Sequence, residues 1–479
     1  MQLSAILSGR KPSLSWDWDL SRNTTAKLYG LLMAILLIRL ALLAVYPLLD
    51  TSEARYAEMA RKMVELNDWV TPMFDYEVPF WGKPPLSFWA QALSIKIFGP
   101  NEFAVRLPSL LYLLACCSLL IRWGREEHSL ELGLLAAIVL ASSSLGFVAF
   151  GAVLTDPALC FSLLLAVYGF WRVIHYSDQF WAYMGFVGLA FGMLAKGPIA
   201  LVLFGAPAFF WLLLHRQWYA LFNIPWLGGL ALFFILSAPW YVIAEWKTPG
   251  FWDYFFIGEH WRRFLVPGWA GDLYGNAHLH PRAYIWIYAF AATLPWCLLP
   301  VFKRRSRWKS LIKEPLFQYS GIIVVCLLVF FSFSRNILWT YVLPVLPLLA
   351  LMLAWMLLKI NSSFRTILFS SLLLPALVII MCIEGSKFDS WKNQKQVIQY
   401  WSEHKVGGEP LFAYKRRIYS AEFYSGGLAS RLPENLDGLA GTRFYLIVRE
   451  SYQLEGPDLK PACVLKQKIT GSELYYCQL

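Results

Sequence analysis

The chain has 479 residues, of which 58% are hydrophobic and only 15% are charged, and its mean hydropathy is +0.49. Soluble domains average about 45–50% apolar and about 25% charged residues, so this composition excludes an ordinary soluble enzyme and indicates a polytopic membrane protein. The net charge of +11 at pH 7 does not indicate nucleic-acid binding, because much of the excess lies in short loops between apolar runs.

About eleven apolar runs are long enough to cross a bilayer core of about 30 Å, which takes about 20 helical residues each. The basic segment 1–27 has no apolar core of its own, so we expect the first run, and not a cleaved leader, to be the insertion signal. The apolar segment 86–98 is short, and we expect it to be re-entrant or interfacial. The predicted spans are 28–48, 104–124, 129–150, 155–175, 180–195, 198–215, 222–245, 283–302, 316–334, 338–358 and 365–384.

The charges of the short loops predict the orientation. With the basic N-terminus in the cytoplasm, alternation of the spans puts the basic cluster at 303–313 on the cytoplasmic side, as the positive-inside rule requires. An odd number of spans then places the tail, residues 385–479, on the outer face. The tail alternates strand-like and helix-like runs with Gly and Pro turns, so we expect a small α/β domain there, after an all-α transmembrane domain over residues 1–384.

The first outer loop, residues 49–103, opens with a charged stretch. Charges alternate with small and apolar residues at helical spacing from Glu53 to Glu65, which predicts an amphipathic helix at the membrane surface with its charges in water. Asp50 and Glu53 have the spacing of a capping box, and that role does not exclude chemistry. The loop then reads PFWGKPPL, whose prolines fix an extended backbone and present Lys83; an exposed interfacial lysine is the simpler alternative.

The same topology places the acid and cation combinations of the chain on the outer face. Asp156 precedes Pro157 at the start of a span, which describes a helix N-cap as well as a functional carboxylate. Lys196 lies in a short turn, where it either completes a helix dipole or binds phosphate. Ionisable groups are costly near a membrane, so a one-sided cluster indicates an outward-facing functional site.

A second outer loop, residues 246–282, carries the stretch GEHWRRF at 258–264. Two arginines beside a histidine favour a ligand that bears phosphate, because guanidinium groups match phosphate oxygens. The histidines lack the tight helical spacing of motifs such as HExxH, so we expect no metal centre. The chain also has no Walker loop and no GxGxxG, which excludes a donor bound by those nucleotide motifs.

Two other classes of protein compete with an enzyme. A transporter or lipid flippase would predict an inverted repeat, or matching helices broken by Gly and Pro, and the sequence shows neither. A non-catalytic scaffold leaves a fixed lysine beside acids unexplained.

In the tail, Cys463 and Cys477 flank a predicted hairpin whose turn lies near residue 470. Directly opposed strand positions lie within disulfide reach, and an exported tail permits oxidation. We therefore predict a disulfide, with a reduced cross-strand pair as an equally open alternative. The other six cysteines lie within apolar runs and are most simply small hydrophobic residues.

In the charged motifs of its outer loops and in several of its spans, the chain resembles the bacterial GT-C glycosyltransferases of the protein-mannosyltransferase-like superfamily. It resembles most strongly the lipid A 4-amino-4-deoxy-L-arabinose transferases. It departs from the latter at Gly82, where they tend to carry a glutamate before the Lys-Pro pair. The matching stretches follow the family order over most of residues 28–358, and they include SEARYAEMARKM, KPPL at 83–86, VLTDPAL around Asp156, LAKGPIAL around Lys196, IGEHWRRF and TYVLPVLPLLA at 340–350.

The resemblance implies an inner-membrane enzyme that moves a sugar, with inversion, from a polyprenyl-phosphate-linked donor to lipid A or another envelope acceptor on the periplasmic face. We expect no cofactor and no nucleic-acid partner. A protein O-glycosyltransferase and a polytopic lipid or solute transporter stay as alternatives. We expect Asp50, Glu53 and Asp156 to be catalytic carboxylates with Asp50 as the favoured base, Lys83, Arg55, Arg263 and Lys196 to bind the donor phosphate, and Tyr56, Glu259, His260, His280 and Tyr341 to contact substrate.

Overall fold

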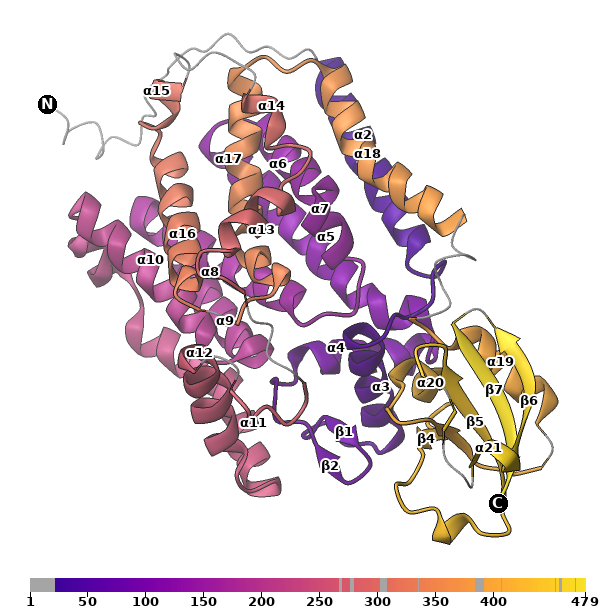
Figure 1. The fold of residues 1–479 in the computed structure, drawn as a ribbon. Helices are drawn as coiled ribbons and strands as arrows, with labels where there is room; N and C mark the ends of the chain where they lie inside the picture. The colour runs from indigo at the N-terminus through magenta and orange to yellow at the C-terminus, as the bar shows by residue number, and fades with distance from the viewer. Residues whose placement is uncertain are drawn as a thin grey trace, which may run out of the picture.

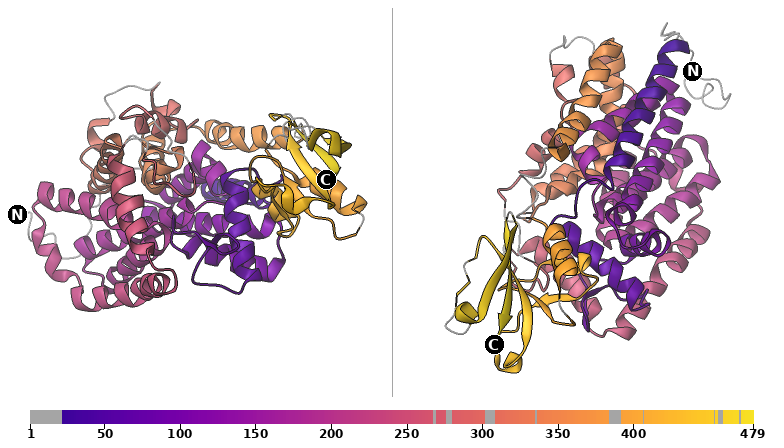
Figure 2. Two further views of the ribbon diagram at one scale, coloured as in Figure 1. Left: turned by 60° about the horizontal axis from the view of Figure 1, so that its bottom comes forward. Right: turned by 90° about the vertical axis from the view of Figure 1, so that its right-hand side faces the viewer.

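The computed structural model describes residues 22–266, 269–275, 280–301, 308–334, 336–383, 392–405, 407–452, 454–455, 459–469 and 471–479. Its helices form one bundle, and a C-terminal sheet lies at one end of that bundle beside α3 (Ser52–Glu65) (Figure 1). The turned views in Figure 2 show the same arrangement, with the sheet outside the helices.

The predicted membrane spans are helical. Within the described ranges, seven helices are long and apolar enough to cross a membrane, and the chain is a multi-pass membrane protein. The predicted run 129–150 is broken after Ser142, and the run 283–302 is broken between α13 and α14, so the count of eleven spans stays a prediction. The bundle consists of α2 (Arg22–Leu42), α5 (Glu102–Glu127), α6 (Leu130–Ser142), α7 (Ser144–Ala149), α8 (Asp156–Tyr176), α9 (Gln179–Lys196), α10 (Ile199–His215), α11 (Trp226–Lys247), α13 (Ile285–Ala292), α14 (Leu298–Val301), α16 (Pro315–Ser332), η4 (Trp339–Val345), α17 (Leu346–Lys359) and α18 (Phe364–Ile383).

The helical hairpin of α8 and α9 brings Asp156 and Lys196 together, although 40 residues separate them in the chain. A Cβ atom on Gly169 would lie 2.4 Å from the carbonyl oxygen of Trp181, and one on Gly188 would lie 2.6 Å from that of Ser162. Glycine at these positions allows the two backbones to approach closely, as small residues do between membrane helices. Because the two helices run antiparallel, the first residue of α8 and the last residue of α9 lie at the same end of the bundle.

The charged helix in the first loop exists, but the expected exposure of its charges is wrong. In α3 the side chains of Glu58, Arg61 and Lys62 are buried, with at most 8% of their surface exposed. The C-terminal helix α20 (Tyr419–Tyr424) packs against α3, and Lys62 Nζ lies 3.5 Å from Glu422 Oε2. Helical spacing showed that the helix has a polar face, but it could not show that another part of the chain covers that face.

The predicted capping box is also wrong. Helix α3 is preceded by Thr51, whose side chain makes no capping hydrogen bond, and the carboxylate of Asp50 points to the C-terminal region. Glu53 accepts a hydrogen bond from the amide of Leu49, not from that of Asp50. The loop then continues through β1 (Met73–Asp75), β2 (Val78–Pro79) and the short apolar helix α4 (Leu86–Phe98).

The predicted α/β character of the tail is confirmed. Its five strands lie in the order β4-β3-β5-β7-β6, with β3 parallel to both β4 and β5 and the remaining pairs antiparallel. The expected domain boundary at 384/385 lies outside the described residues and stays a prediction. The elements are α19 (Lys395–His404), β3 (Leu411–Ala413), α20, β4 (Ala429–Arg431), η6 (Asp437–Leu439), β5 (Arg443–Arg449), α21 (Leu459–Ala462), β6 (Cys463–Ile469) and β7 (Ser472–Gln478).

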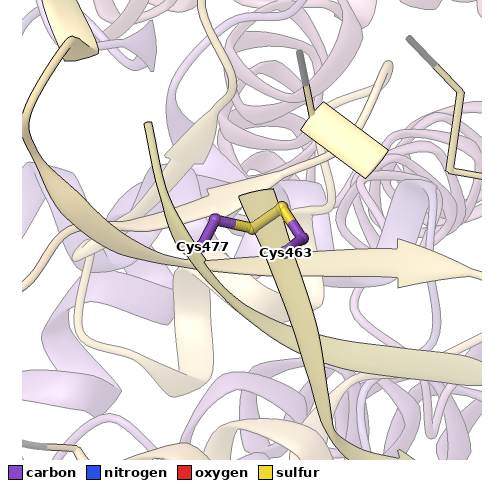
Figure 3. Close-up of a disulfide and its surroundings, with 2 residues drawn as sticks. All are labelled: Cys463 and Cys477. Atoms are coloured by element: carbon purple, nitrogen blue, oxygen red, sulfur yellow. A yellow bond between two sulfur atoms is a disulfide. The ribbon is translucent and has the colours of Figure 1, made fainter. Parts of the chain in front are cut away.

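The predicted disulfide is present. Cys463 and Cys477 are directly opposed in the β6–β7 ladder, and their sulfur atoms are bonded (Figure 3). The bond ties the edge strand β6 to β7, which in turn pairs with the central strand β5.

Replacing Cys463 and Cys477 together by serine should lower the free energy of unfolding of the tail by about 3 kcal/mol, the value expected for a cross-link that closes a loop of about 15 residues. Chemical unfolding of the full-length protein in detergent measures this loss. The single replacement Cys297→Ser, a free cysteine of the bundle, is the control and should change the tail little. Modification of both tail thiols without prior reduction would contradict the bridge.

Candidate active site

A cavity of about 90 Å³ lies where α8 begins and α9 ends. Its wall combines cations and an acid from three separate stretches of the chain with apolar side chains from the bundle. The polar lining residues are Lys83, Lys196, Glu259, His260, Arg263, Ser334, Asn336 and Tyr341, and the apolar ones are Leu159, Ile199, Leu203, Phe331 and Pro344.

One ion pair closes the α8–α9 end of the cavity. Lys196 Nζ contacts Asp156 Oδ1, and it also lies 4.7 Å from the centre of the Tyr341 ring. Asp156 is the first residue of α8 and Thr155 precedes it as the cap residue, so the interpretation of Asp156 as the N-cap is wrong. The predicted residues Asp156, Lys196 and Tyr341 thus lie together.

A second ion-pair cluster comes from η2, a π-helix over Asp253–Arg262. Arg263 Nη1 donates to both carboxylate oxygens of Glu259, at 2.9 and 2.8 Å, and Lys83 Nζ lies 3.5 Å from Glu259 Oε2. Burial works to raise the pKa of Glu259, but the charges of Lys83 and Arg263 outweigh it and hold that pKa below its ordinary value. Glu259 is therefore an anion at neutral pH that orders two cations at the cavity.

His260 connects the two clusters. Its Nδ1 lies 2.8 Å from the carbonyl oxygen of Phe255, and its Nε2 lies 3.0 Å from that of Lys196. Burial, together with the charge of Lys83, lowers the pKa of His260. A neutral imidazole has one N–H, so it donates to one of these carbonyls and fixes η2 against the end of α9.

The chain is similar to characterised proteins over most of its length. Residues 24–255 match the family described as dolichyl-phosphate-mannose-protein mannosyltransferase. The undecaprenyl phosphate-α-4-amino-4-deoxy-L-arabinose arabinosyl transferase of Pseudomonas aeruginosa PAO1 is 31% identical over 348 residues, which are 70% of this chain and 60% of that protein. Transferase 1 of Pseudomonas fluorescens is 29% identical over 385 residues, 75% of this chain and 63% of that protein.

The fold also matches a solved structure. The crystal structure of ArnT from Cupriavidus metallidurans bound to undecaprenyl phosphate superposes with a TM-score of 0.75 at 15% identity, over 94% of this chain and 98% of that one. The chain therefore has the fold of ArnT, and its residues 24–255 match the protein-mannosyltransferase family. It spans about three fifths of the length of the sequence relatives that it matches.

None of the three carboxylates expected to be catalytic lines the cavity: Asp156 contacts the lining residue Lys196, and the other two are bound elsewhere. Asp50 Oδ2 lies 2.6 Å from Arg449 Nη2, and its carboxylate also accepts hydrogen bonds from the amide and hydroxyl of Ser420. Burial raises the pKa of Asp50, while Arg449 and Ser420 oppose that rise. In this geometry Asp50 holds the C-terminal region against the start of α3.

Glu53 is bound to an arginine that the sequence interpretation did not include. Its two carboxylate oxygens lie 2.8 and 3.0 Å from Nε and Nη2 of Arg106, which is fully buried. Arg106 also donates to the backbone carbonyls of Leu43, Tyr46 and Pro47. An arginine inside a predicted apolar span was a usable signal, because such charges are costly and need a partner.

The remaining predicted residues do not line the cavity. Arg55 Nη1 donates to the carbonyl oxygen of Tyr274 at 2.6 Å, and the ring of Tyr56 packs edge-on against Phe88. His280 stacks on Tyr284 and contacts the hydroxyl of Tyr288, away from the cavity lining. The structure assigns no reaction to any of these residues, and their substrate contacts stay predictions.

Ser334 and Asn336 are lining residues that sequence reasoning missed. They lie between α16 and η4, and the hydroxyl of Ser334 bonds to the backbone carbonyl of Asn336. A polar Ser-Arg-Asn segment between two apolar spans was the signal that could have revealed them.

Gly82, the departure from the arabinosyltransferases, is packed against an aromatic ring. A Cβ atom there would lie 2.9 Å from the ring of Phe80, so a longer side chain would require that ring to move. The chain therefore presents no acid beside Lys83 at this position.

Proposed function

We propose that this protein transfers a sugar from a polyprenyl-phosphate-linked donor to an acceptor of the cell envelope in a bacterial inner membrane. The observation that carries the proposal is the set of three cations, Lys83, Lys196 and Arg263, around one small cavity of a membrane bundle. Breaking the bond between the sugar and the phosphate leaves negative charge on the phosphate, which preorganised cations stabilise. Relatives named as undecaprenyl phosphate aminoarabinose transferases support this substrate class.

An apolar groove next to the cavity supports a lipid-linked donor. The groove has a volume of about 790 Å³ and lies between α10 and α16, with Phe210 and Phe330 among its lining residues. Leu203 of α10 and Phe331 of α16 line the polar cavity, so the same pair of helices bounds both spaces. A prenyl tail in the groove would bring its phosphate to the cations.

The acceptor determines how much base the reaction needs. A hydroxyl acceptor must lose its proton as it attacks the anomeric carbon, whereas a phosphate acceptor is already anionic. Asp156 is the carboxylate that we favour as this base, because its partner Lys196 lines the cavity, whereas Arg449 and Arg106, the partners of Asp50 and Glu53, do not. Inversion follows if the acceptor displaces polyprenyl phosphate in a single step.

The first test is release of polyprenyl phosphate by the purified protein in lipid nanodiscs. The wild-type protein should release it together with a glycosylated product, and Asp156→Asn should lower the rate by about 10²–10⁴-fold for a hydroxyl acceptor. The control is Asp178→Asn, which keeps the cap at the opposite end of the same hairpin and should leave transfer unchanged. Movement of intact donor across the bilayer without released polyprenyl phosphate would support a transporter instead.

The acceptor class needs a separate measurement. Mass spectrometry of lipid A, other glycans and surface proteins, from cells with and without the gene product, identifies which molecule gains the sugar. A modified lipid A supports the proposal in its most specific form, and a modified protein supports the O-glycosyltransferase alternative.

We also propose that the N-terminus is cytoplasmic and that the cavity and tail face the periplasm. Basic short loops support this orientation, and so does the disulfide in the tail, because disulfides persist in oxidising compartments. Reporter fusions at Lys309 and at Glu434 should report opposite compartments. The same compartment for both fusions would contradict the orientation.

A further inference from the structure

We propose that Tyr274 is a positioning residue for Lys83, and that its phenol fixes the loop that carries this cation. The inference rests on the proposed function, because it assigns Tyr274 to the same reaction. Nothing in the sequence marks Tyr274: it lies in the second loop, about 190 residues after Lys83. The inference comes from the contacts of its hydroxyl, its ring and its backbone.

The hydroxyl of Tyr274 bridges two backbone groups just before Lys83. It accepts a hydrogen bond from the amide of Trp81 at 3.1 Å and donates one to the carbonyl oxygen of Pro79 at 2.8 Å. Burial raises the pKa of Tyr274 to about 12, so the phenol keeps the proton that it donates. Two residues before the cation, the loop is therefore held by a side chain from another part of the chain.

The loop depends on this bridge because it has few hydrogen bonds of its own. The residues after Lys83 are Pro84 and Pro85, which have no backbone N–H to donate. The ammonium group of Lys83 donates to the carbonyl oxygen of Gly82 at 2.6 Å, so its position follows the peptide that precedes it. A shift at Trp81 or Gly82 thus moves the cation relative to Glu259 and the cavity.

The ring and the backbone of Tyr274 connect the loop to the other cations. The ring packs against Phe80 at a centroid distance of 4.6 Å. Its backbone amide donates to Asp272, whose other carboxylate oxygen lies 3.3 Å from Arg263 Nη2. Its carbonyl accepts from Arg55. Tyr274 therefore connects the loop of Lys83 with Asp272, a carboxylate partner of Arg263, and so joins the supports of the two cations that would share the donor phosphate.

Tyr274→Phe is the informative variant, because it keeps the ring packing and removes only the hydroxyl bridge. The matched control is Tyr76→Phe. Tyr76 lies in the turn between β1 and β2, and its hydroxyl bonds to Glu65 of α3 and not to the loop that carries Lys83. Amide hydrogen exchange, followed by mass spectrometry on the full-length protein, measures how well the backbone amides of the loop are protected. This measurement does not depend on sugar transfer. The Trp81 amide should exchange about tenfold faster in Tyr274→Phe and at the wild-type rate in Tyr76→Phe, since a lost hydrogen bond is worth about one factor of ten.

A double-mutant cycle then tests whether Tyr274 acts through Lys83. We expect Tyr274→Phe to lower kcat for release of polyprenyl phosphate about tenfold with the donor KM nearly unchanged, and to have no further effect in a Lys83→Ala background. A role confined to folding would give additive losses in the cycle. Faster exchange with that additive result would overturn the positioning role.

The two measurements distinguish failure of the positioning role from failure of the proposed function. Unchanged exchange of the Trp81 amide in Tyr274→Phe would show that the Tyr274 hydroxyl does not hold the loop, whatever the protein catalyses. If the wild-type protein releases no polyprenyl phosphate, the proposed function fails, and the exchange measurement still decides whether Tyr274 holds the lysine loop.

Discussion

Lys83→Ala should lower the rate of sugar transfer about 10²–10³-fold, the typical cost of removing one preorganised charge contact at the point where charge develops. Lys83 is only 19% exposed and reaches the cavity beside Glu259, so neither water nor a neighbouring flexible side chain replaces it easily. The loss should appear in kcat for release of polyprenyl phosphate, because the contact strengthens as the phosphate leaves.

The control for this variant is Lys96→Ala, which removes an exposed lysine from the last turn of α4, the helix that follows the same loop. It should leave transfer unchanged. Full activity of Lys83→Ala at normal membrane abundance would move the leaving-group role to Lys196 and Arg263. Since Lys83 also stabilises the anionic form of Glu259, the variant should raise the pKa of that carboxyl towards its ordinary value.

Arg106→Met should be the most destabilising single change at the start of the bundle. It leaves the carboxylate of Glu53 buried without its cation and leaves three backbone carbonyls between residues 43 and 47 without a donor. Breaking a buried ion pair from one side costs about 3–5 kcal/mol, mostly because the remaining charge stays buried. The free energy of unfolding in detergent micelles measures the loss.

The double variant Glu53→Leu with Arg106→Met is the matched comparison. Replacing both partners by apolar residues of similar size removes the uncompensated charge, so the double variant should recover stability relative to Arg106→Met alone. A loss below about 1 kcal/mol in Arg106→Met would show that water enters the site and that the pair is not buried in the membrane protein as it functions.

The sequence predicted the membrane bundle well because an apolar run of about 20 residues is a local signal. It did not predict the break after Ser142, since apolar residues continue on both sides of it. The alternation of strands and helices in the tail was equally local. Packing between distant elements leaves no local signal in the sequence. For this reason the charged face of α3 was predicted to be exposed to water, whereas α20 covers it.

In the candidate site, too, the residues found in sequence motifs were predicted, and their distant partners were not. The family motifs contain Lys83, Lys196 and Glu259, which line one cavity although they lie far apart in the chain. Spacing alone suggested that Asp50 and Glu53 form a pair with one role. Their partners, Arg449 and Arg106, are separated from them by 399 and 53 residues, and no local pattern names a partner at such distances.

The buried charges of α3 also constrain the order in which the protein is assembled. Lys62 pairs with Glu58 and Asp75 and also meets Glu422 across 360 residues of chain, so the last of its partners is made long after the helix. Until the tail has folded against α3, Glu58 and Lys62 must stay hydrated, and the front of the bundle cannot reach its final packing. Docking of the tail therefore completes the burial of these charges, and a chain truncated before α19 would leave the polar face of α3 without α20 to cover it.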